Sequence, residues 1–440
     1  MPRSPRGLTA RPGELRSYST IHCLGIEWDL EGDSDHDATC SVEYRAKGQA
    51  EWRKALPLLR VDFYGWYADR KADRAYNMLA GSVLFLEPGS TYEVRLELRD
   101  PDGGASTKVV PISTRPIPAL SEGGRTLHVT SGLGGGKGSP GDPFKGLGAA
   151  QAQARPGDTV LLHKEDYGRF TFDESGSPGQ YIVWKAAGDG EAVFEHVEVA
   201  ASHVWFERLT LTRPAEDVSN GFVGRGPAVD VVVAGNTFTG YHYSILLSNE
   251  SRDWYIADNV IVGDQDPLTG GIGGEGVELN HSSGHVVAHN RISRTADGVS
   301  YAHRNCDIYG NDIFDVCDDG LEPDYGYSNI RMWGNRLTNC KNAAFSFQPM
   351  YCGPWYIIRN QAIGSSHMFK FRVQDRFVLA HNTFVRWGYM DSRMHHILTS
   401  LSRNNLYISA GGTDSGTDTE IRRVRACCQR LAREGALAVG

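Results

Sequence analysis

Long apolar runs, paired cysteine motifs and an excess of basic charge are all missing from this sequence of 440 residues. No stretch of 18 consecutive apolar residues occurs, so no membrane span is predicted. The formal net charge of −8 gives no electrostatic reason to expect nucleic acid as a partner. The eight cysteines include no CxxC pair, which argues against a zinc cage.

Two further signals are lacking near the N-terminus. Residues 1–20 contain no apolar segment of the kind found in secretory signals, so either the protein stays in the cytoplasm or its export signal is absent from this chain. The segment "SGLGGGKGS" is not a phosphate-binding P-loop, because Ser131 replaces its first glycine and Gly138 follows Lys137 in place of Ser or Thr. We therefore expect no nucleotide and no organic cofactor.

An asparagine that returns every 21 to 31 residues is the strongest positive signal. Apolar residues recur three positions before it, and mostly apolar ones recur two positions after it. A period of this length with short apolar runs is typical of a solenoid, because no single unit can bury its apolar side alone. The recurring residues are Asn236, Asn259, Asn290, Asn311, Asn335, Asn360, Asn382 and Asn404.

The residue types around each asparagine identify the kind of solenoid. The runs are short and rich in Val, Ile, Phe and Tyr, whereas a helical repeat needs longer segments of 3.6-residue periodicity. Asparagine tolerates left-handed backbone angles, so we expect a tight bend at each one. An all-β parallel β-helix is predicted, with three strands per coil of about 22 residues and an Asn ladder between coils. A β-sandwich whose turns contain Asn is the alternative.

Within residues 17–118, alternating apolar and polar segments separated by turn-rich stretches predict a separate small antiparallel β-sandwich. Trp28, Tyr44 and the segment 86–96 ("LEPGSTYEVRL") resemble the core tryptophan, the central strand and the tyrosine corner of a fibronectin type III module. The resemblance covers about 100 residues and implies a spacer or docking surface without catalysis.

The β-helix is predicted over residues 119–410, and its first coil is preceded by a short capping helix within 146–154. Residues 411–440 lose the coil pattern and are expected to form a C-terminal cap or a disordered tail. Cys317 and Cys340 fall at nearly the same place in successive coils, where they form either a disulfide or stacked thiols.

Polar residues follow a regular pattern in the strand that precedes each bend. Side chains alternate in and out along a strand, and the second and fourth positions are mostly apolar. The third and fifth positions then form two outward columns. The first contains Glu278, Ser300, Glu322, Ser346 and Lys370, and the second contains Asn280, Ala302, Asp324, Gln348 and Arg372.

This predicted patch brings three carboxylates and two cations onto one face. Neighbours in a column are expected roughly 4.8 Å apart, and Glu322 and Asp324 roughly 6.6 Å apart. His281 and His303 border the patch, and Asp318 and Asp319 enter from the preceding turn. An ordinary solvated polar face is the alternative interpretation.

The strings "YIIRN", "FKF" and "LAHNTFV" resemble the pectate-lyase-like superfamily of right-handed β-helix proteins, over about residues 125 to 408. The resemblance implies a right-handed coil, a polysaccharide partner and a secreted, periplasmic or cell-surface location, and we expect a monomer. It does not define the reaction, because the superfamily contains lyases, hydrolases, epimerases and non-catalytic adhesins.

A polysaccharide lyase acting on uronic-acid polymers is the preferred functional hypothesis. In β-elimination a cation neutralises the uronate, a base removes the C5 proton and an acid protonates the leaving oxygen. Glu278, Glu322 and Asp324 are the predicted Ca²⁺ ligands, since Ca²⁺ prefers several oxygen donors. Lys370 or Arg372 is then the base and the other clamps the uronate, with His303 as a further candidate base.

Two alternatives stay open. An inverting glycoside hydrolase would use Glu322 with Asp324, or Asp319 with Glu322, at a carboxyl separation of ~6.5–9.5 Å. A non-catalytic carbohydrate-binding or surface protein would use exposed aromatic residues to stack on sugar rings. In each case Asn280, Gln348 and Tyr325 are predicted to contact the polysaccharide.

Overall fold

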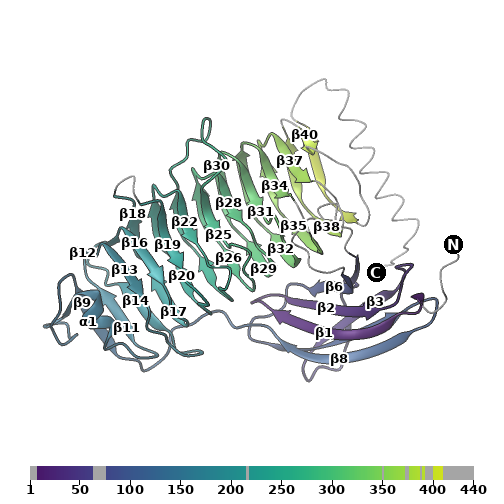
Figure 1. Cartoon of the computed structure of the whole chain (residues 1–440), viewed down its shortest axis with the longest axis horizontal. Helices are drawn as coiled ribbons and strands as arrows, with labels where there is room; N and C mark the ends of the chain where they lie inside the picture. The colour runs from purple at the N-terminus through teal and green to yellow at the C-terminus, as the bar shows by residue number, and fades with distance from the viewer. Residues whose placement is uncertain are drawn as a thin grey trace.

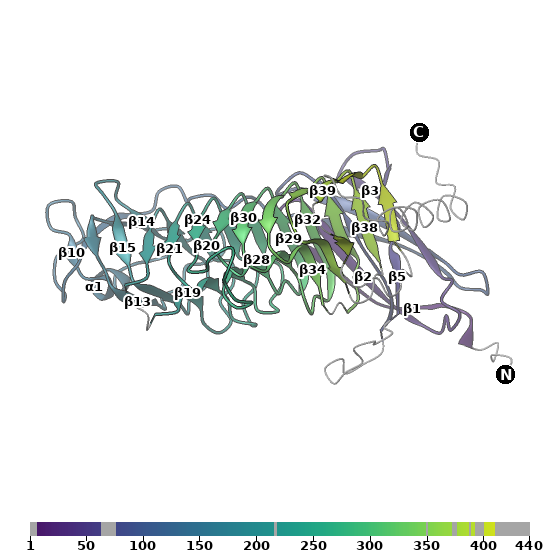
Figure 2. The same cartoon turned by 90° about the horizontal axis from the view of Figure 1, so that it is seen from above.

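A computed structural model describes residues 7–62, 76–214, 218–348, 351–371, 376–386, 389–391 and 400–409. The chain forms a small antiparallel β unit followed by a long stack of parallel coils (Figure 1). The antiparallel unit lies alongside the later coils, far from the first coil, as both views show (Figures 1 and 2). This all-β architecture confirms the predicted fold class.

The N-terminal unit contains two four-stranded antiparallel sheets. In the first, the order is β1 (Arg11–Ser19), β2 (Leu24–Glu31), β6 (Asn77–Val83), β5 (Leu59–Asp62). In the second, it is β4 (Arg53–Lys54), β3 (Thr39–Ala46), β7 (Thr91–Arg99), β8 (Ala105–Ser113). Trp28 is buried between them, and the Glu87 N–H donates to Tyr92 Oη at 3.0 Å. The fibronectin type III resemblance stays a prediction.

The solenoid contains three parallel sheets. The 13-stranded sheet runs β10 (Phe144–Lys145), β9 (Thr126–Thr130), β11 (Thr159–Leu162), β14 (Ile182–Ala186), β17 (Val204–Glu207), β20 (Val232–Ala234), β23 (Tyr255–Ala257), β26 (Val286–Ala288), β29 (Arg304–Tyr309), β32 (Ser328–Trp333), β35 (Trp355–Ile358), β38 (Phe377–Ala380), β41 (Ser400–Arg403). The 11-stranded sheet runs β12 (Glu165–Asp166), β15 (Ala192–Phe194), β18 (Thr210–Thr212), β21 (Thr237–Thr239), β24 (Val260–Val262), β27 (Arg291–Ser293), β30 (Asp312–Val316), β33 (Arg336–Cys340), β36 (Gln361–Ile363), β39 (Thr383–Arg386), β42 (Leu406–Ser409). The ten-stranded sheet runs β13 (Arg169–Phe172), β16 (His196–Val199), β19 (Asn220–Gly224), β22 (Tyr243–Leu246), β25 (Glu275–Glu278), β28 (Asp297–Ser300), β31 (Asp319–Glu322), β34 (Ala343–Phe347), β37 (His367–Phe371), β40 (Tyr389–Asp391).

Helix α1 (Leu147–Gln151) lies within the segment predicted to cap the first coil, and its Leu147 and Ala150 join the β-helix core. Of the described residues, none belongs to a helix with the length and apolarity needed to cross a membrane. Cys317 and Cys340 are both buried free thiols. The predicted tail 411–440 lies outside the described residues.

The Asn ladder is present and continuous. The main-chain N–H and Nδ2 of Asn290 both donate to Asn311 Oδ1, at 2.9 and 3.0 Å, and the same pair of bonds repeats from Asn236 to the last rung. The last rung is Asn405, not Asn404 as predicted, because β38 and β41 pair Leu379 with Ser402 and this register brings Asn405 under Asn382. Rungs follow one another at intervals of 21 to 31 residues, so the predicted coil of about 22 residues was slightly short.

The left-handed bend lies one residue earlier than predicted. The residue before each ladder asparagine has positive φ, for example His289 at 57°, Arg359 at 56° and Asn404 at 52°. The asparagines from Asn236 to Asn382 are instead almost fully buried, because their side chains turn inward to bond the neighbouring coil. Asparagine is therefore selected here for its amide and not for its tolerance of left-handed angles.

Buried ion pairs join the N-terminal unit to the 13-stranded sheet. Arg331 has no exposed surface, forms an ion pair with Asp307, and donates to Ser82 Oγ at 3.0 Å. Glu27, equally buried, accepts from Arg304 Nε at 3.1 Å and from the Ser328 hydroxyl. Separating the two units would leave these buried charges without partners, which is strongly destabilising.

Candidate functional site

Three successive coils begin their strand of the ten-stranded sheet with an acid followed by glycine. The main-chain N–H of Asp319 donates to Asp297 Oδ1 at 2.8 Å, so the acids stack from coil to coil. A Cβ at Gly298 would lie 2.4 Å from the carbonyl oxygen of Gly320, so only glycine allows the coils to approach this closely. The three pairs are Glu275–Gly276, Asp297–Gly298 and Asp319–Gly320.

Four carboxylates converge at the last of these strands, and we call Asp297, Asp318, Asp319 and Glu322 the acidic centre. One oxygen of each lies within 4.8 Å of the others, and all four residues are buried. Lys370 Nζ contacts Asp319 Oδ2 at 2.7 Å. The other oxygen, Asp319 Oδ1, is buried with no hydrogen-bond partner among the described residues. The centre therefore retains an unused acceptor.

The first predicted column is present in the strand register. Glu278 pairs with Ser300, Ser300 with Glu322, and Ser346 with Lys370. Glu278 is less buried than the acidic centre and, like Asp324, does not belong to the four converging carboxylates. Of the three predicted metal ligands, the structure therefore places only Glu322 in that group.

The second predicted column does not continue the alternation. Strands β25, β28 and β31 end at the first column, and the turns that follow contain left-handed residues such as Tyr301 and Tyr325. Ala302 consequently lies in the core and Tyr301, predicted to face inward, is partly exposed. Asp324 is buried and accepts the main-chain N–H of Gln348.

Asn280 and Tyr325, two other predicted site residues, lie in the turns that follow β25 and β31. Asn280 donates its side-chain amide to Leu247 O at 3.0 Å. Arg372, the predicted partner of Lys370, lies outside the described residues. Of the aromatic residues, Tyr325 lines a pocket of about 360 Å³ together with Tyr76, His281, Tyr301, His303, Tyr327 and Tyr351, and we call this the tyrosine groove.

The tyrosine groove meets the acidic centre at Tyr301, whose main-chain N–H donates to the main-chain oxygen of Glu322 at 2.8 Å. The rings of His281 and Tyr301 are 5.0 Å apart, and those of Tyr301 and Tyr325 are 6.3 Å apart. Burial raises the pKa of Tyr301, and the Glu322 and Glu275 carboxylates raise it further, so the phenol stays neutral. Rows of aromatic rings with polar tips suit a ligand that has both apolar faces and hydroxyl groups.

Burial holds protons on several of these carboxyls. It raises the pKa of Glu275 to about 8, of Glu278 to about 7 and of Asp319 to about 7, with neighbouring acids adding to the effect at Glu275 and Asp319. The pKa values of Asp297 and Asp324 are raised well above the usual range for the same reasons. Glu322 shares hydrogen bonds with both of them.

The pKa values of two basic side chains at the site, Lys370 and His303, are shifted in opposite directions. Burial opposes the charge on Lys370, but Asp319 outweighs it and raises the pKa of the ammonium. Burial, helped by Arg304, lowers the pKa of His303 to about 4. At neutral pH the lysine keeps its proton and the imidazole is neutral.

Replacing Glu275 with glutamine should reduce the pH dependence of stability. A folded pKa of about 8 above an unfolded value of ~4.3 means that this carboxyl stabilises the fold below pH ~4 and that the contribution is lost as the pH rises through 8. The wild-type protein should therefore lose stability relative to Glu275→Gln between pH 5 and pH 8, by at least about 1.4 kcal/mol. Urea unfolding at both pH values measures the difference.

Glu198→Gln is the control for this titration. The Arg225 guanidinium lowers the pKa of Glu198, so its charge does not change between pH 5 and pH 8. Equal pH dependence in both variants would contradict the raised pKa of Glu275.

Sequence reasoning missed Glu275 and Asp297 altogether and placed Asp318 beside the predicted patch without giving it a catalytic or metal-binding role. The predicted columns count positions from the glycine of each strand, so they exclude the acid immediately before it. The signal was available in the repeated pattern of an acid, a glycine and an aliphatic residue in "EGVE", "DGVS" and "DGLE".

Comparison with known proteins identifies the fold and little else. Residues 220–384 match the family profile of the right-handed β-helix region. No curated protein matches the sequence. One similar solved structure is described as the complex structure of XylC with xylose, with 11% identity and a TM-score of 0.32, covering 64% of this chain and 65% of that one. The profile and the strand topology together establish a right-handed parallel β-helix.

Proposed function

We propose that this chain is a carbohydrate-active enzyme that cleaves an acidic polysaccharide by β-elimination at the acidic centre and the tyrosine groove. The observation that carries the proposal is the convergence of four buried carboxylates, one with an unused oxygen, beside a groove lined with aromatic rings. Such perturbed, convergent carboxyls next to a concave surface are typical of reactive sites.

The acidic centre fits a divalent cation such as Ca²⁺. Its donors are all carboxylate oxygens, the ligands that hard cations prefer, and one oxygen of each lies within 4.8 Å of the others. Asp319 Oδ1 offers an acceptor that no described group uses. A bound cation would neutralise the uronate carboxylate and so make the C5 proton more acidic.

The side chains around the centre have suitable protonation states for the remaining steps. Lys370 keeps its proton because of Asp319, so it serves as a cationic contact for the uronate and not as the predicted base. His303 is neutral, and its unprotonated ring nitrogen accepts the C5 proton. Tyr301 is a neutral phenol whose Oη protonates the leaving glycosidic oxygen.

Inverting hydrolysis fits this geometry less well. The hydrogen bond between Glu322 and Asp324 and the 4.8 Å limit between oxygens of Asp319 and Glu322 leave less room than the ~6.5–9.5 Å that accommodates an attacking water. Glu322 and Asp324 are better described as carboxyls that share a proton, whereas Asp319 is paired with Lys370.

Removal of divalent cations should lower the rate of cleavage by at least about 100-fold, since a metal contributes several kcal/mol of charge stabilisation. The chain is incubated with uronate polymers and with neutral glycans, before and after EDTA treatment, and then with added Ca²⁺. Ultraviolet absorbance of unsaturated sugars and release of reducing ends are followed together.

The outcomes separate the functional classes. Absorbing products that disappear with EDTA and return with Ca²⁺ support the proposal. Reducing ends without absorbance would indicate hydrolysis instead. Binding of a glycan with neither product would indicate a carbohydrate-binding protein, and activity insensitive to EDTA would rule out the cation.

A further inference from the structure

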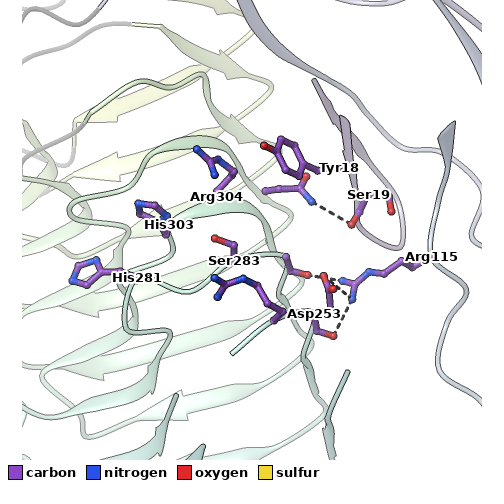
Figure 3. Close-up of a pocket in the computed structure, with 11 residues that line it drawn as sticks. Tyr18, Ser19, Arg115, Asp253, His281, Ser283, His303 and Arg304 are labelled. Atoms are coloured by element: carbon purple, nitrogen blue, oxygen red, sulfur yellow. Dashed lines mark hydrogen bonds and ion pairs between the residues drawn. The ribbon is translucent and has the colours of Figure 1, made fainter. Parts of the chain in front are cut away.

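A second pocket, of about 420 Å³, lies where the N-terminal unit meets the β-helix (Figure 3). Tyr18 and Ser19, at the end of β1, form one wall, and Arg115 follows β8. Arg252 and Arg304 come from the β-helix coils opposite. The pocket therefore exists only because the two units are joined at this place.

Positive charge dominates this pocket, although the whole chain has a net charge of −8. Among its described lining residues, three are arginines and one, Asp253, is an acid. His281 and His303 also line the pocket, and His303 is neutral at neutral pH. Arg115 contacts that acid at 3.3 Å and also donates to its main-chain oxygen at 2.9 Å, as the dashed lines in Figure 3 show. The one carboxylate among the described lining residues is therefore already paired with an arginine.

Arg304 is also anchored, in a way that fixes its position. Its Nε contacts Glu27 at 3.1 Å and its guanidinium lies 4.0 Å from the ring centroid of Tyr327. An arginine held by an ion pair and an aromatic face loses little conformational freedom when it binds a ligand.

Arg252 has no such partner. Its Nη1 donates to the main-chain oxygens of Asn249 and Ser251, at 3.0 and 2.7 Å, which orients the guanidinium without neutralising it. Within the described parts of the chain it forms no ion pair. The exposed Arg252 guanidinium therefore faces the pocket without an ion-pair partner of its own, with the Asp253 carboxylate, already paired with Arg115, as the nearby opposite charge. Such a guanidinium is suited to bind an anion.

The pocket continues into the tyrosine groove, because His281 and His303 line both. A chain-like ligand that lies in the groove would thus extend into the pocket. A small free anion would occupy the pocket alone and would not need the connection to the groove.

We propose that this pocket is a subsite for an anionic sugar residue of the same polysaccharide, with Arg252 binding the carboxylate of a uronate. This inference takes the class of ligand, an acidic polysaccharide, from the proposed function. It does not require that the chain cleaves that ligand. The N-terminal unit then contributes a wall of the substrate-binding site in addition to its structural role.

Calorimetric titration of the full chain tests the subsite. The probes are tetramers of galacturonate, mannuronate, guluronate and glucuronate, each beside its carboxyl-reduced counterpart, in a Glu322→Gln background to prevent turnover. At least one uronate tetramer should bind more tightly than its reduced form. Adding Arg252→Gln should raise its Kd about 10-fold or more, because a charge-assisted hydrogen bond is lost.

Arg225→Gln is the matched control, since Arg225 is an exposed arginine of the same β-helix that pairs with Glu198 away from the pocket. Its Kd should equal that of the parent. Equal affinity for acidic and reduced tetramers, or equal Kd values for the two arginine variants, would each overturn the subsite.

The same arginine substitutions, made also in the chain that retains Glu322, separate the two proposals. Weaker binding in Arg252→Gln without cleavage of any polymer would support the subsite and reject the lyase. Cleavage with a KM that Arg252→Gln leaves unchanged would support the lyase and reject the subsite.

Discussion

Replacing Glu322 with glutamine should lower kcat/KM by about 10²–10⁴-fold, the range expected when a proton-transferring or charge-stabilising group is lost. Glu322 belongs to the acidic centre and shares hydrogen bonds with Asp297 and Asp324. An amide has nearly the same shape but carries neither the negative charge nor the shared proton. Initial rates on the cleaved polymer, at saturating Ca²⁺, measure the effect.

Glu198→Gln provides a control in the same column of the same sheet. Strand register connects Glu198 through Val223 and Leu246 to Glu278, and from there to Glu322. Glu198 has no place in the acidic centre, so its variant should keep its rate within about 2-fold, as for other surface substitutions. Full activity of Glu322→Gln, or equal losses in both, would remove the acidic centre from the mechanism.

Replacing Asp307 with asparagine should cost about 3–5 kcal/mol of stability, the penalty for leaving a buried charge without its partner. Asp307 and Arg331 have no exposed surface, and Thr20 Oγ1 of the N-terminal unit donates to Asp307 Oδ2 at 2.5 Å. The substitution leaves the Arg331 guanidinium uncompensated at the contact between the two units. Urea unfolding measures the loss, and limited proteolysis shows whether the units separate first.

Asp312→Asn is the matched control for this interface. Asp312 lies in β30, on another sheet of the same coil, where it pairs with the exposed Arg336 at 2.8 Å. Exposed ion pairs contribute only about 0–1 kcal/mol, so this variant should unfold close to the parent. Similar losses in both variants would show that burial of Asp307 has no special cost.

The repeat was predictable because stacked coils must repeat the same buried positions. The ladder spacing gave the register of strands that are hydrogen-bonded but distant in sequence, and the column through Glu278 and Glu322 followed from it. That reasoning holds only inside regular strands. It stopped at Tyr301 and Tyr325, whose left-handed conformations break the alternation and turn aromatic rings toward the groove.

The in-and-out alternation of side chains along a strand gives the wrong face for the acids that precede the glycines. Asp319 and Glu322 are three residues apart, which puts them on opposite faces of a regular strand. A Cβ at Gly320 would lie 2.8 Å from the buried Cys340 sulfur, and Leu321 is also buried, so two successive residues face inward. This local irregularity brings both acids to one side.

Contacts between the two units were beyond sequence reasoning for a different reason. Arg331 hydrogen-bonds Ser82, 249 positions away, and nothing periodic links them. The cationic pocket depends on the same docking.

The longest interval of the ladder, 31 residues between Asn259 and Asn290, shows how such a protein can change its specificity. Its extra length leaves the coil as a loop between β24 and β25, immediately before the strand that begins with Glu275, and the next rung restores the register. Loops at this turn can therefore lengthen, shorten or be exchanged while the core remains the same. The residues that form the core and the ladder are therefore distinct from the loop residues that can contact a ligand. Changes in the loops, by natural variation or by design, can alter the groove one coil at a time.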